Sequence, residues 1–143
     1  MKFFLPIETA PELLLNLLSL PIPAGFPSPA ADYVETRIDL NKLLIKNPTC
    51  TFFAYAEGDS MFPVIKDGNL LVVDRKDEPV SGWTVLASVN NEFCVKEFFK
   101  FPDGSIELRP VNPIYPAIHL PSEFEGDFEI FGRVIKAIQD LEK

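Results

Sequence analysis

The sequence is poor in the residues that bind metals or form disulfides, with one histidine and two cysteines among 143 residues. His119 lies in a strand-like run where it is expected to face outward, which disfavours a Ser-His-Asp triad. Cys50 and Cys94 lack the C-x-x-C spacing of a zinc site. We therefore expect no metal site, no cofactor and no disulfide framework, and we expect both cysteines to be reduced and buried.

Positive charge is also scarce, because 13 lysines and arginines stand against 21 acidic residues and give a net charge of −8. Proteins that hold nucleic acid tightly neutralise its phosphates with lysine and arginine. Tight direct DNA binding is therefore not expected. The longest apolar run also falls short of the roughly 18 residues that a membrane-spanning helix needs, so no membrane association is expected either.

The leucine-rich stretch 13–20 could suggest a signal peptide, but its context disfavours secretion. Lys2 is the only basic residue near the start, and Glu8, Pro11 and Glu12 interrupt what would have to be a continuous apolar region. The sequence thus predicts a cytoplasmic protein. The leucines are expected to form a short helix with one apolar face that docks on the body.

Hydrophobic residues, in contrast, are abundant at 47%, and 13 of them are phenylalanines. Such a composition predicts one packed domain rather than a disordered chain. Short apolar runs separated by turn signals such as Asp67-Gly68 and Asn90-Asn91 predict a mostly β fold of short antiparallel strands, partly closed. The expected strands are residues 50–56, 70–73, 83–89, 93–99, 106–108 and 128–138.

Before these strands lie a predicted helix and a proline-rich tether. The helix is expected within 32–47, with Asp39 as its N-cap and Pro48 as its stop. Residues 21–29 hold four prolines around Gly25. Because proline fixes φ and removes a hydrogen-bond donor, this stretch is expected to be extended and unpaired, like a protease substrate. A plain linker remains the alternative.

Ser60 follows Gly58 and Asp59 at a predicted turn leaving a strand. Such a turn can expose the serine Oγ beside backbone N–H groups that hold an oxyanion, and the expected donors are the amides of Asp59 and Ser60. Taken alone, Gly-Asp-Ser is more often an ordinary turn.

Lys96 lies in the apolar run Phe93-Cys94-Val95-Lys96. Loss of hydration there would lower the lysine pKa and leave a neutral amine able to accept a proton. A surface lysine with its stem along the strand is the competing interpretation. Together, Ser60 and Lys96 have the layout of a Ser-Lys hydrolase.

A wider set of motifs resembles the UmuD proteins of the SOS mutagenesis response, which share a self-cleaving Ser-Lys peptidase fold with the LexA repressors. The resemblance is carried by the string from Gly25 to Glu35, by Gly58-Asp59-Ser60-Met61, by Val95-Lys96 and by Asn112. It runs from about Gly25 to the last strand, while residues 1–20 show little of it.

The resemblance implies a role for each matching position. Ser60 would be the nucleophile, Lys96 its general base, and Ala24-Gly25 the bond that the protein cuts in its own arm. It further implies a homodimer that cleaves itself on meeting a RecA filament on single-stranded DNA. The shortened form would then serve as accessory subunit of an error-prone, UmuC-like translesion DNA polymerase.

The predicted organisation is an N-terminal arm over 1–24 that self-cleavage removes, a linker with a short helix over 25–48, and a β catalytic and dimerisation domain over 49–143. Two alternatives stay open. The body could be a non-catalytic interaction module for a polymerase partner, or a peptidase like LexA and the phage repressors without a role in translesion synthesis.

Overall fold

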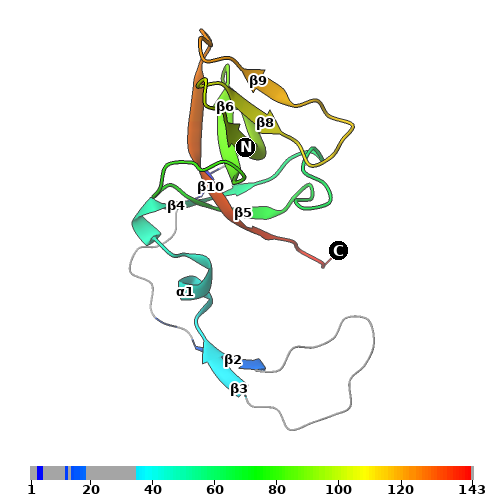
Figure 1. Ribbon diagram of the computed structural model, residues 1–143. Helices are drawn as coiled ribbons and strands as arrows, with labels where there is room; N and C mark the ends of the chain where they lie inside the picture. Colours follow the sequence, from blue (N-terminus) through cyan, green and yellow to red (C-terminus); the bar gives the residue numbers. More distant parts are fainter. Residues whose placement is uncertain (1–2, 5–11, 13, 19–34, 143) are drawn as a thin grey trace. The chain divides into compact units, whose positions relative to one another are not determined.

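The computed structural model describes residues 3–4, 12, 14–18 and 35–142 (Figure 1). The chain forms two compact units, one of residues 1–8 with 47–143 and the other of residues 9–46. No helix in the described part of the chain is long and apolar enough to span a membrane.

The larger unit is built on an eight-stranded antiparallel sheet with the strand order β1-β4-β5-β10-β6-β7-β8-β9. The long strand β10 lies between β5 and β6 (Figure 1). The mostly β prediction is thus confirmed. The elements of this unit are β1 (Phe3–Phe4), the 3-10 turn η1 (Pro48–Cys50), β4 (Thr51–Tyr55), β5 (Leu70–Asp74), β6 (Thr84–Val89), β7 (Glu92–Lys100), β8 (Ile106–Arg109), β9 (Ile118–Leu120) and β10 (Phe128–Ile138).

The turn chemistry between β6 and β7 explains why these strands form a tight hairpin. Asn90 and Asn91 have φ values of 50° and 66°, and asparagine adopts this left-handed region more readily than most residues do. The resulting register pairs Val85 with Lys96 and Leu86 with Val95. A two-residue turn in the sequence thus fixes where Lys96 lies in the sheet.

In the smaller unit, β2 (Leu15–Leu18) pairs antiparallel with β3 (Glu35–Ile38), and α1 (Leu40–Leu44) follows. The prediction of a helix in the leucine-rich stretch was therefore wrong for residues 15–18. Four residues cannot offset the cost of nucleating a helix, whereas pairing with β3 supplies partners for their backbone groups.

The predicted helix within 32–47 is confirmed over residues 40–44 only, because residues 35–38 belong to β3. The prediction that Pro48 stops the helix was wrong, since Ile45 is the C-cap and Pro48 begins η1. Its predicted cap is confirmed, since the Asp39 side chain accepts a hydrogen bond from the Asn41 amide at 3.1 Å. The Ile45 amide closes the last turn by donating to the Asn41 carbonyl at 2.9 Å.

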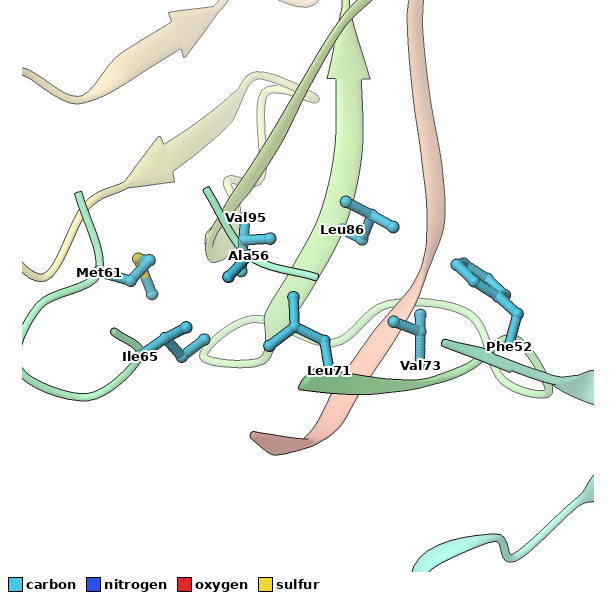
Figure 2. Packing of buried hydrophobic residues seen from close by; sticks show 8 residues of the cluster. All are labelled: Phe52, Ala56, Met61, Ile65, Leu71, Val73, Leu86 and Val95. Atoms are coloured by element: carbon cyan, nitrogen blue, oxygen red, sulfur yellow. The ribbon is translucent and has the colours of Figure 1, made fainter. Parts of the chain in front are cut away.

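One of two hydrophobic clusters in the larger unit joins the sheet to the loop that carries Ser60. Leu71, Val73 and Leu86 are fully buried in this cluster, and Met61 and Ile65 from the loop pack with them (Figure 2). Burying a side chain of this size contributes about 1.5–3 kcal/mol. Two such anchors hold the residues after Ser60 firmly on the core. The second cluster consists of Val85, Ala87, Phe98, Leu108 and Leu120.

Gly132 on β10 provides a test of how tightly the centre of this sheet is packed. A Cβ at this position would lie 2.7 Å from the Asp74 carbonyl oxygen and 2.9 Å from Val73 Cγ1, so the β5 backbone would have to move. We expect Gly132→Ala to lower the free energy of unfolding by roughly 1–3 kcal/mol. Urea unfolding followed by circular dichroism measures this, and an unchanged midpoint would contradict it.

Candidate active site

Ser60 lies in a loop that joins β4 to β5 and is closed by backbone hydrogen bonds at its base. The Ala56 amide donates to the Asn69 carbonyl at 2.9 Å, and the Gly68 amide donates to the Ala56 carbonyl at 2.8 Å. These bonds extend the pairing of the two strands beyond their ends. The loop therefore leaves and re-enters the sheet at fixed points.

Within the loop, Gly58 sets the turn that precedes Ser60. Its φ of 83° lies in the left-handed region that favours glycine, and its amide donates to Asp67 Oδ1 at 2.7 Å. Asp67 belongs to the predicted Asp67-Gly68 turn, but its contact across the loop was not expected. This bond ties the residues before Ser60 to the far side of the same loop.

Lys96 reaches this loop from β7. The residue is 9% exposed, and Nζ donates to Ser60 Oγ at 2.8 Å and to the Val95 carbonyl oxygen at 3.3 Å. The two residues singled out from the sequence are thus in direct contact although 36 positions separate them. A neutral amine in this place has its lone pair within reach of the serine hydroxyl proton.

The surroundings of Lys96 favour that neutral amine. Burial lowers the pKa of Lys96 from the ordinary value of 10.5, and the neighbouring Cys94 offsets this only in part. Burial also raises the pKa of Cys94, with a smaller opposing effect from Lys96, so the thiol stays neutral at neutral pH. No carboxylate among the described residues lies within ion-pair distance of Nζ. Without a counter-ion, the charged ammonium has little stabilisation.

A pocket of about 370 Å³ opens beside the pair. Its walls combine apolar side chains such as Met61 and Val95 with two carboxylates, Glu57 and Glu92, while Ser60 and Lys96 also line it. Such a cavity can hold a short peptide segment against the serine Oγ, since apolar walls with a few polar groups are typical of ligand sites.

The amides predicted to form an oxyanion hole belong to Asp59 and Ser60. Within the described part of the chain, neither amide donates a hydrogen bond. The carbonyl groups of both residues, in contrast, are engaged. The Asp59 carbonyl accepts from the Phe62 amide at 3.1 Å, and the Ser60 carbonyl accepts from the Asn112 amide at 2.9 Å.

The loop between β8 and β9 holds two residues to which the sequence pattern assigned no function. Asn112 Nδ2 donates to the Asp59 carbonyl oxygen at 3.0 Å, and the Tyr115 hydroxyl donates to the Asp59 carboxylate. The Asp59 carboxylate also raises the pKa of Tyr115, which keeps the phenol protonated. The two prolines in Asn112-Pro113-Ile114-Tyr115-Pro116 indicate a loop, but they do not indicate which residues that loop contacts.

Ala24 and Gly25, the predicted bond to be cut, lie outside the described residues, as does most of the predicted arm. Among the residues that the structure describes, no three histidine, cysteine or carboxylate side chains are grouped so that they could hold a metal ion. The described site combines a serine, a buried lysine, two backbone amides that donate no hydrogen bond to a described residue, and the adjoining pocket.

Comparisons with known proteins point to one family. The sequence profile described as Peptidase S24-like matches residues 16–135. SamA of Salmonella typhimurium is 46% identical over 113 residues, which cover 78% of this chain and 76% of SamA. MucA of Escherichia coli is 36% identical over 118 residues, covering 82% and 79%. The LexA repressor of Clostridium perfringens is 31% identical over 125 residues, covering 84% of this chain and 59% of the repressor.

Proposed function

The chain belongs to the Peptidase S24-like family, and from this premise we propose that it is a serine peptidase that cuts its own Ala24–Gly25 bond. Ser60 is the nucleophile and Lys96 the general base. The observation that carries the proposal is the 2.8 Å contact between Ser60 Oγ and a lysine that is 9% exposed and has a lowered pKa.

Acylation begins when neutral Lys96 accepts the hydroxyl proton of Ser60 while Oγ attacks the carbonyl carbon of Ala24. The carbonyl oxygen becomes an oxyanion, which the amides of Asp59 and Ser60 are free to bind. The C–N bond to Gly25 then breaks. The Lys96 ammonium returns its proton to the departing Gly25 nitrogen, leaving Ala24 esterified to Ser60.

Deacylation repeats the proton transfers with water as nucleophile. Lys96 accepts a proton from the water as its oxygen attacks the ester carbonyl, and the amides bind the second oxyanion. When the C–O bond to Ser60 breaks, Oγ takes the proton back from Lys96. The products are an arm ending in a free Ala24 carboxylate and a body whose new N-terminus is Gly25.

The residues around the scissile bond suit this site. Ala24 presents a small side chain to the pocket, and Gly25 lets the backbone approach the nucleophile without a Cβ. Proline favours an extended backbone, and the four prolines of residues 21–29 leave the Ala24–Gly25 bond itself free of proline. A segment that is already extended loses less conformational entropy on binding than a flexible one.

The processed protein is further proposed to act as a homodimeric accessory subunit of an error-prone translesion DNA polymerase, with cleavage stimulated by a RecA filament on single-stranded DNA. Support comes from the resemblance to UmuD proteins and from the similarity to SamA and MucA over most of the chain. The net charge of −8 agrees with binding to a protein rather than directly to DNA.

Incubation of the purified protein at neutral and alkaline pH tests the proposal. We expect the 16.1 kDa chain to be cut once, at a first-order rate that rises with pH, and the larger fragment to begin at Gly25. Intact mass and N-terminal sequencing measure this, with and without a RecA filament. A fragment that begins elsewhere would show that Ala24–Gly25 is not the bond that is cut. An unchanged rate with the filament would contradict stimulation by RecA but not the roles of Ser60 and Lys96.

A further inference from the structure

Asn112 makes two hydrogen bonds to the backbone on either side of the Ser60 Cα. Its side-chain Nδ2 donates to the Asp59 carbonyl oxygen at 3.0 Å, and its own amide donates to the Ser60 carbonyl oxygen at 2.9 Å. The first of these bonds spans 53 positions of sequence. A single residue of the β8–β9 loop therefore holds both peptide units that flank the serine.

Because a peptide unit is planar, these two contacts also fix the directions of the N–H groups of Ser60 and Met61. In a planar trans peptide unit, the C=O and N–H bonds point in opposite directions. Holding the Asp59 carbonyl toward Asn112 thus directs the Ser60 N–H away from Asn112 within the same peptide plane. The Ser60 carbonyl is held in the same way and directs the Met61 N–H.

Asn112 is itself well fixed. Its Oδ1 accepts from the Ile114 amide at 3.3 Å, its carbonyl accepts from the Tyr115 amide at 3.2 Å, and the preceding Val111 packs against the hydrophobic cluster that includes Met61. The Tyr115 hydroxyl adds a contact from the same loop to the Asp59 carboxylate. Every polar group of Asn112 is used, so its donor is held in place before any substrate binds.

We propose that Asn112 is a positioning residue that aims the Ser60 N–H at the oxyanion of the acylation step. This inference rests on the proposed function, because it concerns an oxyanion formed at Ser60. The Asn112 side chain makes no hydrogen bond to the nucleophile Oγ or to Lys96 Nζ, so it acts through the backbone. Its loss should weaken oxyanion stabilisation without changing the proton affinity of the base.

Asn112→Ala in the full-length protein is the first variant. It removes Nδ2 and keeps the backbone amide that donates to Ser60. We expect the plateau of the rate against pH to fall roughly 10- to 100-fold, while the pH midpoint, which reports deprotonation of Lys96, stays unchanged. Ile114→Ala is the matched control, because Ile114 is 77% exposed on the same loop and contributes only its amide to Asn112. The control should cleave like the parent.

Asn112→Asp is the second variant. It keeps the side-chain shape and the acceptor for the Ile114 amide but places an oxygen against the Asp59 carbonyl, so we expect a larger fall in the plateau. Thermal unfolding of each variant monitors the fold. If both variants kept the parental plateau of cleavage rate against pH, the inference would be overturned. A shifted pH midpoint in both variants, or loss of the fold in both, would also overturn it.

Labelling with a fluorophosphonate separates failure of this inference from failure of the proposed function. The reagent forms a tetrahedral adduct on a reactive serine, and its phosphoryl oxygen occupies the oxyanion position. We expect the parent to be labelled at Ser60 and Asn112→Ala to be labelled more slowly by a factor similar to its loss of cleavage. An unlabelled, inactive parent would contradict the proposed function itself, whereas equal labelling and cleavage of parent and variant would contradict only the role of Asn112.

Discussion

Ser60→Ala is expected to reduce self-cleavage by a factor on the order of 10⁴ to 10⁶, which leaves no product on the time scale of the parent reaction. The methyl group cannot form the ester with Ala24, so the first covalent step is lost. Loss of this one atom also removes the acceptor that lies 2.8 Å from Lys96 Nζ. The fold should survive, because Met61 and Ile65 still anchor the loop on the core.

Intact mass after prolonged incubation at alkaline pH measures this loss. Ser122→Ala is the matched control, since Ser122 lies on an exposed turn after β9 and should leave cleavage unchanged. Mixing the Ser60→Ala chain with parent protein adds a further measurement, because cutting of the variant's arm in the mixture reports cleavage between chains. If Ser60→Ala alone still produced the fragment starting at Gly25, Ser60 would not be the nucleophile.

The sequence predicted strands β4 to β8 and β10 of the larger unit well, because their signals are local. The apolar run 93–99 lies within β7, and the Asn90-Asn91 turn before it has the positive φ values that a tight hairpin requires. The run 128–138 coincides with β10. Short apolar runs bounded by turn residues define such strands locally, so no distant contact is needed to identify them.

The leucine-rich stretch shows where local reasoning fails. Apolar residues at 14, 17 and 18 fit one face of a helix, yet residues 15–18 pair as β2 with Glu35–Ile38. Short apolar runs are ambiguous between helix and strand, and the deciding partner lies far along the chain. The helix predicted within 32–47 begins later than expected for the same reason, because residues 35–38 form β3.

In the candidate site, too, some residues have local sequence signals and others are placed by distant contacts. Ser60 and Lys96 could be singled out because a small-residue turn and a lysine in an apolar run are each visible in a few residues. The contacts of Asn112 and Tyr115 with Asp59 span 53 and 56 positions, and nothing local to residues 112–115 signals them. Sequence patterns thus identify the groups that carry out a reaction more readily than the groups that orient them.

Lys96→Arg should slow the reaction strongly at every accessible pH, although it conserves positive charge. The guanidinium group stays protonated below about pH 12 and cannot accept the Ser60 proton, so we expect a loss of roughly 10²- to 10⁴-fold. The parent, in contrast, should lose about tenfold in rate for each pH unit below the lowered pKa of Lys96 and reach a plateau above it, because only the neutral amine is a base.

Rates of fragment formation across a pH series measure both effects. Lys100→Arg, at the exposed end of the same strand, is the matched control and should keep the parental profile. A parent whose rate does not change with pH, or an arginine variant that keeps the parental rise, would show that the lysine charge does not control the step. Burial is the main cause of the lowered pKa of Lys96, so a carboxylate placed beside Lys96 should raise that pKa and move the profile toward higher pH.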